Sequence, residues 1–280
     1  MSQKYLRQVR ATFSGAGAGI AVTELKIEFD VMKTISGVPN EGVVRVYNLN
    51  SRNRQALGKE FDKVRLEAGY QGTGMGIILQ GAIREVFHRR DEVDIISEVS
   101  VGDGDQADRT GVVAKTWPTG TEVKQIIQDI YKDGMPGISQ GELRGLDDLP
   151  RTRRPVTIVS SSRRAMDQIA RSNNLYWSYQ NETLEIIPAD GHLNHRTLIS
   201  PQTGMIGVPT ITDNGIVVQT LLDASIRPNR LIEVQSETLD MNDAGSTYRV
   251  NSVGFRGDNR DGPFMAEVEG ANIANGKVTG

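Results

Sequence analysis

Residues 40–70 read NEGVVRVYNLNSRNRQALGKEFDKVRLEAGY, and this stretch decides the predicted fold. In Val43–Tyr47, successive side chains fall on opposite faces, as in a half-buried strand. The next residues interrupt the strand, and Ser51 is placed to cap a short helix over Arg52–Leu57. The alternation returns in Lys63–Tyr70. A short helix between two half-buried strands predicts a barrel-building unit rather than a catalytic loop.

The composition bounds the class of protein. The chain has 280 residues, which is enough for two or three modest domains, and its 30 glycines and 5% aromatic content favour a β-rich protein with many turns. It contains no cysteine, which excludes disulfides, thiol catalysis and thiolate metal sites. Its net charge of −3 provides no general attraction for nucleic acid. No segment approaches the ~20 apolar residues of a membrane span, so we expect a soluble protein made in a cytoplasm.

Both ends of the chain carry alternating segments. In the first third the alternation is found in Val22–Lys33, Ile77–Phe87 and Val93–Val101. The last third contains four more candidate strands, Ile216–Leu222, Leu231–Ser236, Tyr248–Phe255 and Phe264–Val268. The glycine-rich GAGAGI at residues 15–20 lacks the Lys-Ser/Thr pair of a phosphate-binding loop, and a hairpin or an arm is the better interpretation. These patterns predict sheets at both ends.

The pattern changes at about Val112. A capping box at Thr119 and Glu122 precedes an amphipathic helix, which ends near Gly134. A second helix is expected over residues 163–172, with a cap among residues 160–162, followed by a hairpin over residues 175–187. Residues 112–188 therefore predict a compact α+β unit between the two β-rich ends.

Arg151, Arg153 and Arg154 form the most basic patch of the chain. One interpretation is a solvated loop, whose charge is balanced by nearby carboxylates. The alternative is a contact with DNA or an acidic partner, although no aromatic residues alternate with the arginines to stack on bases.

The chain carries little evidence of chemistry. His192 and His195 lie in a polar linker without a third metal ligand, and the acidic run that begins at Asp103 fails the calcium-loop pattern at Ala107. No nucleophile motif is present. We therefore predict no catalytic residue, no metal site and no cofactor, although a glycosidase pair of carboxylates, distant in sequence, stays open.

Several phrases resemble baseplate hub proteins of tailed bacteriophages. They are YNLN (47–50), LEAGY (66–70), QGAIREV (80–86), the pair at 103–104, SPQTGMIGVP (200–209), GIVVQTLLDASIRPN (215–229) and FRGDNRDGPF (255–264). They occur in the family's order, and the resemblance covers about two-thirds of the chain. The residues that carry it, with structural roles, are Asn48, Leu49, Gly69, Tyr70, Gly81, Asp103, Gly104, Pro201, Gly204, Gly207, Pro209, Leu221, Leu222, Gly257 and Asp258.

The resemblance implies two β-barrel tube domains, residues 1–111 and 189–280, which flank a middle α+β domain of LysM-like outline at residues 112–188. It implies a homotrimeric ring that joins the hexameric tail tube to the central spike and lets DNA and the tape-measure protein pass. The partners would be these proteins and other baseplate proteins, and the location would be the virion tail, after assembly in the host cytoplasm. We expect a neutral or acidic pore wall, with the three arginines at the periphery.

Two alternatives stay open. The middle residues could form a cell-wall hydrolase or a glycan-binding module, which would require a cleft with paired carboxylates of perturbed pKa. The chain could instead be the hub part of a type VI secretion spike. Such a spike is expected to continue into a β-helix, whereas this sequence stops at Gly280.

Overall fold

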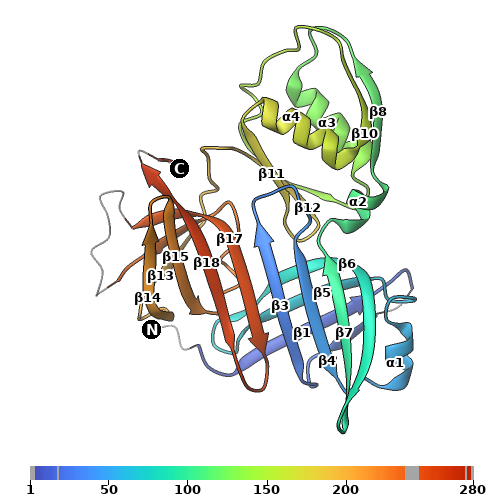
Figure 1. The fold of residues 1–280 in the computed structure, drawn as a ribbon, viewed down its shortest axis with the longest axis vertical. Helices are drawn as coiled ribbons and strands as arrows, with labels where there is room; N and C mark the ends of the chain where they lie inside the picture. Colours follow the sequence, from blue (N-terminus) through green and yellow to red (C-terminus); the bar gives the residue numbers. More distant parts are fainter. Residues whose placement is uncertain (1–3, 18, 237–245, 275, 279–280) are drawn as a thin grey trace.

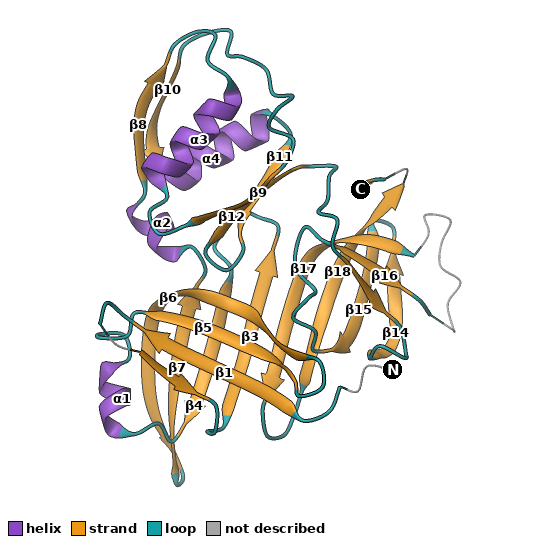
Figure 2. Cartoon of the chain, turned by 180° about the vertical axis from the view of Figure 1, so that it is seen from behind, coloured by secondary structure: helices purple, strands orange, loops and turns teal. Residues whose placement is uncertain are grey.

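The computed structural model of the chain describes residues 4–17, 19–236, 246–274 and 276–278. One large sheet crosses the width of the molecule, and a segment that holds three of the four described helices stands at one end of the long axis (Figures 1 and 2). Within the described residues, fourteen strands belong to the large sheet. The prediction of a β-rich chain with few helices is confirmed.

The first end of the chain supplies seven strands and one short helix. They are β1 (Arg7–Ser14), β2 (Gly19–Val22), β3 (Ile27–Thr34), β4 (Glu41–Tyr47), α1 (Ser51–Ala56), β5 (Lys63–Tyr70), β6 (Gly74–Asp91) and β7 (Asp94–Gly102). The predicted strand–helix–strand unit is therefore β4–α1–β5. Asn50, rather than Ser51, caps α1, because its side-chain oxygen accepts a hydrogen bond from the N–H of Asn53 at 2.9 Å.

The last third supplies the other seven strands. They are β13 (Arg196–Ile199), β14 (Met205–Thr212), β15 (Gly215–Leu221), β16 (Leu231–Val234), β17 (Thr247–Asp258), β18 (Phe264–Ala274) and β19 (Lys277–Val278). The hydrogen-bonded order of the sheet is β14-β15-β18-β17-β3-β4-β7-β6-β5-β1-β2, and β16 pairs with both β13 and β17. This path stays open at β14 and at β2 among the described residues, so two closed barrels remain a prediction.

The two ends share one strand order. The first end runs β3-β4-β7-β6-β5-β1, and the second runs β14-β15-β18-β17-β16-β13, which is the same permutation of chain order. Both also carry a bulge at the same place in their long strand, between Ile83 and Glu85 on β6 and between Val250 and Ser252 on β17. One pairing differs, because β1–β5 is antiparallel and β13–β16 is parallel. The shared order and bulge indicate an internal structural repeat.

The middle segment, defined here as residues 105–188, has its own small sheets and hydrophobic cluster. Strands β8 and β10 pair with each other, and β11, β12 and β9 form a second sheet. The two main helices pack together between these sheets (Figure 2). Its elements are α2 (Asp105–Thr110), β8 (Val112–Trp117), α3 (Val123–Gly134), β9 (Ser139–Leu143), β10 (Val156–Ser161), α4 (Ser162–Ser172), β11 (Leu175–Tyr179) and β12 (Thr183–Pro188).

The predicted capping box before α3 is wrong. The helix begins after Glu122, whose side chain makes no cap and instead forms an ion pair with Arg151. The N–H of Gly120 donates to the carbonyl of Thr152, and this contact ties the residues before the helix to the later loop. In α4 the predicted cap is confirmed, because Ser161 accepts a hydrogen bond from the first turn.

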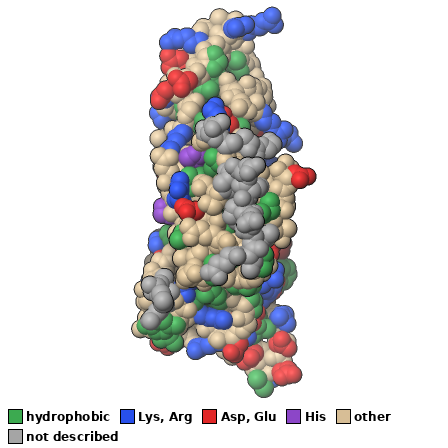
Figure 3. All heavy atoms as spheres, turned by 90° about the vertical axis from the view of Figure 1, so that its left-hand side faces the viewer, with side chains coloured by type: hydrophobic (Ala, Val, Ile, Leu, Met, Phe, Trp, Pro, Cys, Tyr) green, Lys and Arg blue, Asp and Glu red, His purple; other side chains and the backbone are tan. Residues whose placement is uncertain are grey.

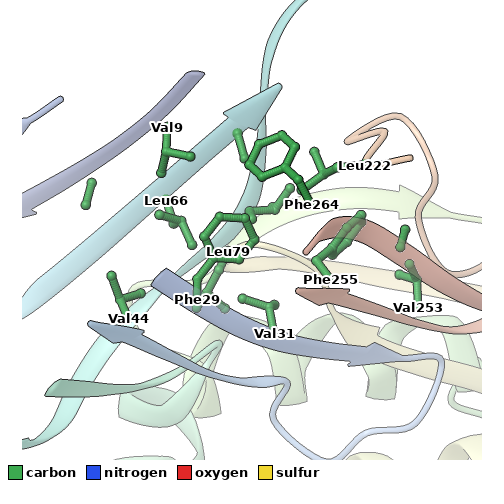
Figure 4. Packing of buried hydrophobic residues seen from close by; sticks show 14 of the residues in the cluster. Val9, Phe29, Val31, Val44, Leu66, Leu79, Leu222, Val253, Phe255 and Phe264 are labelled. Atoms are coloured by element: carbon green, nitrogen blue, oxygen red, sulfur yellow. The ribbon is translucent and has the colours of Figure 1, made fainter. Parts of the chain in front are cut away.

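Strands β3 and β17 pair along a seam that joins the two ends into one sheet. Seven register pairs connect them, and Val31 lies opposite Phe255. Behind the seam, the ring of Phe264 packs edge-on against Phe29 at 6.0 Å and Tyr70 at 5.3 Å between centroids. Buried side chains from both ends belong to one hydrophobic cluster (Figure 4). The seam is thus stabilised both by backbone pairing between β3 and β17 and by aromatic packing on its buried face.

Gly257 lies against the seam, and its replacement tests how tightly the seam is packed. A Cβ at this position would lie 2.1 Å from the Phe29 ring, whereas a Cβ at Gly254, on the same strand, would meet only the Met32 side chain at 3.9 Å. We expect Gly257→Ala to lower the free energy of unfolding by about 1–3 kcal/mol through overpacking. Chemical denaturation should show that Gly254→Ala costs less, and equal effects would contradict this account of the seam.

Candidate functional site

A buried polar joint connects the large sheet to the middle segment. We define it by Lys33, Asn40, Asp103, Asn181 and Glu182. The carboxylate of Asp103 accepts hydrogen bonds from the N–H groups of Asn181 and Glu182, both at 2.6 Å. Asn40 donates to the Asp103 carboxylate at 3.4 Å and to the carbonyl of Tyr179 at 2.5 Å. The end of β7 is therefore fastened to the β11–β12 turn.

The hairpin turn is shaped for this contact. Asn181 and Glu182 both have positive φ, 59° and 57°, as the two central residues of a type I′ turn require. The next residue after Asp103, Gly104, also has a positive φ of 78°, and a Cβ there would lie 2.4 Å from the Tyr179 ring. The predicted Asp-Gly pair is a strand-end turn, and the structure adds that its carboxylate is buried at the joint.

Lys33 completes the joint from β3. Its side chain is 1% exposed, and its ammonium donates to the side-chain oxygen of Asn181 at 2.6 Å. Burial lowers the pKa of Lys33 to about 8, against the attraction of the Asp103 carboxylate. Burial likewise raises the pKa of Asp103, while the Lys33 charge and the two amides act to lower it. The opposite charges of Lys33 and Asp103 thus partly compensate each other's burial.

A second buried contact ties the middle segment to the last third of the chain. The carboxylate of Glu185 on β12 accepts hydrogen bonds from both terminal nitrogens of Arg230, at 2.7 and 3.0 Å, and from the side-chain amide of Asn229 at 3.1 Å. The ion pair is nearly buried, with side-chain exposures of 5% and 12%. The middle segment is consequently attached to both ends of the chain.

Four of the resemblance residues meet at the seam. The hydroxyl of Tyr70 donates to the carbonyl of Phe264 at 3.4 Å, and the N–H of Leu222 donates to the same carbonyl at 3.1 Å. Gly257 makes room for the Phe29 ring, and Asp258 shapes the following turn by accepting from the N–H of Arg260 at 2.7 Å. These residues share a structural environment, not a chemical site.

The other resemblance residues lie in turns and at strand edges. Asn48 has a φ of 55°, and its side-chain oxygen accepts from the N–H of Ile95 at 2.9 Å. The carbonyl of Gly204 accepts from the N–H of Leu221 at 2.7 Å. The remaining residues are spread over the sheet and are not brought together: Leu49 after β4, Gly69 on β5, Gly81 on β6, Pro201 before β14, and Gly207 and Pro209 in the irregular part of β14.

The three arginines lie on the surface of the middle segment. Arg151, Arg153 and Arg154 are all exposed, and Arg151 pairs with Glu122. Basic side chains are visible at the end of the long axis that the middle segment forms (Figure 3). Their exposure is compatible with both a solvated loop and a partner contact.

No three His, Asp or Glu side chains among the described residues are grouped as metal ligands, including His192 and His195. No helix in the described ranges is long and apolar enough to cross a bilayer.

A family comparison decides what this architecture is. The model of the family described as baseplate hub gp41 matches residues 8–270, which is most of the chain. The chain belongs to the baseplate hub gp41 family. No curated protein matches the hub sequence.

Solved structures share the fold of this hub over nearly its whole length. A 43 kDa tail protein of prophage MuSo2 from Shewanella oneidensis has a TM-score of 0.67 at 10% identity, over 96% of this chain and 98% of its own. A tail protein from Neisseria meningitidis has a TM-score of 0.63 at 11% identity, over 96% and 97%. The E. coli c3393 protein, a type VI secretion component, has a TM-score of 0.64 at 12% identity, over 91% and 75%.

Most of the polar joint is not predicted from the sequence. Asp103 is expected only in a strand-end turn, and neither Lys33 and Asn40 of the joint nor Glu185 of the second buried contact is singled out. One signal was present for Lys33, which continues the buried phase of Ile27, Phe29 and Val31 on β3 and so falls on the apolar face. Nothing in the sequence pairs it with a hairpin turn roughly half the chain away.

Removing the Asp103 charge should lower the stability of the hub. We expect Asp103→Asn to lower the free energy of unfolding by about 3–5 kcal/mol, because Lys33 would remain buried without its carboxylate. Denaturant unfolding measures the loss. Asp147→Asn is the matched control, since its side chain is 86% exposed, and its expected effect is below about 0.5 kcal/mol. A similar effect of both substitutions would contradict the joint.

The joint also predicts a pH dependence. In the fold the pKa of Lys33 is lowered from 10.5 to about 8. Between these pH values the unfolded chain binds more protons than the hub, so the contribution of Lys33 to the free energy of unfolding rises with pH. Lys33→Met lacks this titration. Unfolding from pH 7.5 to 10 should therefore shift the stability difference between the two proteins in favour of the natural chain, and a constant difference would refute the assignment.

Proposed function

We propose that this chain is a purely structural hub that forms a homotrimeric ring, joins the hexameric tail tube to the central spike, and lets DNA and the tape-measure protein pass. The ring would work by matching symmetries, without catalysis. Each chain would provide two similar wall units, residues 1–111 and 189–280, with the middle residues 112–188 outside the wall. Three such chains present six units to a six-fold partner.

The internal repeat carries this proposal. The two ends have the same strand order and the same bulge, and the β3–β17 seam sets them side by side in one sheet (Figure 1). A chain whose two ends are structurally alike can occupy two adjacent positions of a six-fold pattern with quasi-equivalent contacts. Family membership supports the same role, because the family is described as a baseplate hub.

The charge of the sheet supports the passage of DNA. We call the polar face the side of β3, β4, β7, β17 and β18 that points away from the hydrophobic cluster, and propose that it lines the channel. Two of its strand arginines are paired with carboxylates, Arg45 with Glu98 at 2.7 Å and Arg256 with Asp30 at 3.2 Å, and a third, Arg249, is buried and donates to the carbonyls of Ala189 and Gly191. Further carboxylates on this face are Glu28, which pairs with Lys26, Glu41, which pairs with Arg84, and Glu267 and Glu269. A face with more carboxylates than cations would release few counterions from DNA, so it would not gain binding affinity in this way and DNA could slide past it.

The middle segment suits an outward position. It lies beyond the edge of the large sheet and is fastened by the polar joint and by the Glu185–Arg230 pair, so it need not contribute to the channel wall. We propose that Arg151, Arg153 and Arg154 face other baseplate proteins at the periphery. Among the residues that the structure describes, this segment holds no group of three side chains that could bind a metal ion.

The oligomeric state tests the proposal. Three copies of the 30.7 kDa chain have a mass of about 92 kDa, and we expect light scattering of the purified hub to reach this value as concentration rises. A chain that stays at the monomer mass, or that assembles into dimers, would contradict the trimer.

A further inference from the structure

We propose that strand β14 of one copy adds to the second half of β6 of the next copy, and that the β3–β17 seam inside each chain is the template for this contact. The inference rests on the proposed ring and names the surfaces that close it. It follows from the repeat, in which β14 corresponds to β3 and β6 corresponds to β17.

The correspondence leaves two strand edges open. Within one chain, β17 pairs on one side with β16 at Thr247–Arg249 and then with β3 at Ser252–Asp258. Strand β6 pairs on the equivalent side with β5 up to Ala82, and the N–H of Ile83 donates to the carbonyl of Asp62 at 2.7 Å. No described strand of the same chain occupies Glu85–Asp91 on that side. Strand β14, the equivalent of β3, is the last strand of the sheet and also has one free edge. Unpaired edges invite pairing with another chain.

The two open edges lie at opposite sides of the molecule. Strand β14 is at the left of Figure 1, and the end of the sheet formed by β6 and β7 is at the right. A contact between different surfaces of successive copies is heterologous, and it produces a closed ring when the rotation per copy divides a full turn. A second copy is therefore the occupant that the geometry favours.

The register follows from the bulges. Arg84 and Asn251 are the extra residues of the two long strands, so Phe87 corresponds to Gly254. The pairing of β14 with β15 matches that of β3 with β4, so Thr212 corresponds to Met32. Because Met32 lies opposite Gly254 in the seam, Phe87 should lie opposite Thr212 of the next copy.

Side-chain sizes agree with this register. In the seam, the large Met32 of β3 lies over the small Gly254 of β17. Between copies the sizes are exchanged, with the small Thr212 on β14 and the large Phe87 on β6. Phe87 is 58% exposed in the single chain, and Val208 on β14 is also 58% exposed. Pairing of the two edges would cover apolar surface on both strands.

The space beside β6 is also open. A hollow of about 380 Å³ lies between α1 and this edge, lined by residues that include Leu57, Val86 and His88. The corresponding place beside β17 is occupied by β3. Gly207 and Pro209 interrupt the regular pairing of β14 within its own chain, so the continuous part available to the neighbour is Thr210–Thr212.

Introduced cysteines test the register directly, because the chain has none of its own. We expect the double variant Phe87→Cys/Thr212→Cys to form a covalent trimer on mild oxidation, seen on a denaturing gel without reductant. The control is Phe87→Cys/Ile206→Cys, where the register places Ile206 opposite Asp91, roughly 13 Å from Phe87. Disulfides need Cα atoms within about 7 Å, so the control should give at least about tenfold less covalent trimer.

Light scattering of the same samples separates the outcomes. Covalent trimer in the test variant alone supports the proposed pairing. A 92 kDa particle, three times the 30.7 kDa chain, without cross-linking would overturn the pairing and leave the trimeric hub standing. A particle that stays monomeric before oxidation would overturn both the ring and the pairing. Equal cross-linking in test and control would also refute the register.

Discussion

The antiparallel pairing of β3 with β17 holds the two ends of the chain in one sheet. It connects residues more than 200 positions apart and turns two similar sets of strands into one sheet. Backbone hydrogen bonds alone would contribute little net stability, since water offers similar bonds. The aromatic packing of Phe264 against Phe29 and Tyr70 adds the apolar burial that makes the seam favourable.

The polar joint fixes where the middle segment stands. A carboxylate and an ammonium are both removed from water at Asp103 and Lys33, which is costly unless each is compensated. Two backbone amides, an amide side chain and the mutual attraction of the charges offset that cost. An apolar contact of the same size could slide, whereas directional hydrogen bonds to one hairpin turn set a single orientation. We therefore infer that the joint contributes more to a single orientation of the middle segment than to the free energy of unfolding.

The sequence predicts the local elements well, because strand alternation and helix periodicity are local signals. Val43–Tyr47 and Lys63–Tyr70 are strands as predicted, and the hairpin after α4 is where the pattern places it. It predicts Asp103 only as a turn residue, because its partners, the amides of Asn181 and Glu182, carry no sequence signal at all. The shared strand order is likewise invisible in the sequence, because it depends on which edges pair. The capping box at Thr119 and Glu122 does not form, because Gly120 and Glu122 instead contact Thr152 and Arg151 of the later loop.

The proposed ring requires the two ends of one chain to take equivalent places around an axis. A cryo-electron microscopy map of a native tail tip, reconstructed without imposed symmetry, would show these places. We expect three copies of the hub, with six similar wall units that alternate between residues 1–111 and 189–280 at one height. A ring of six copies, or a map in which the two ends occupy different heights along the axis, would contradict the proposed ring.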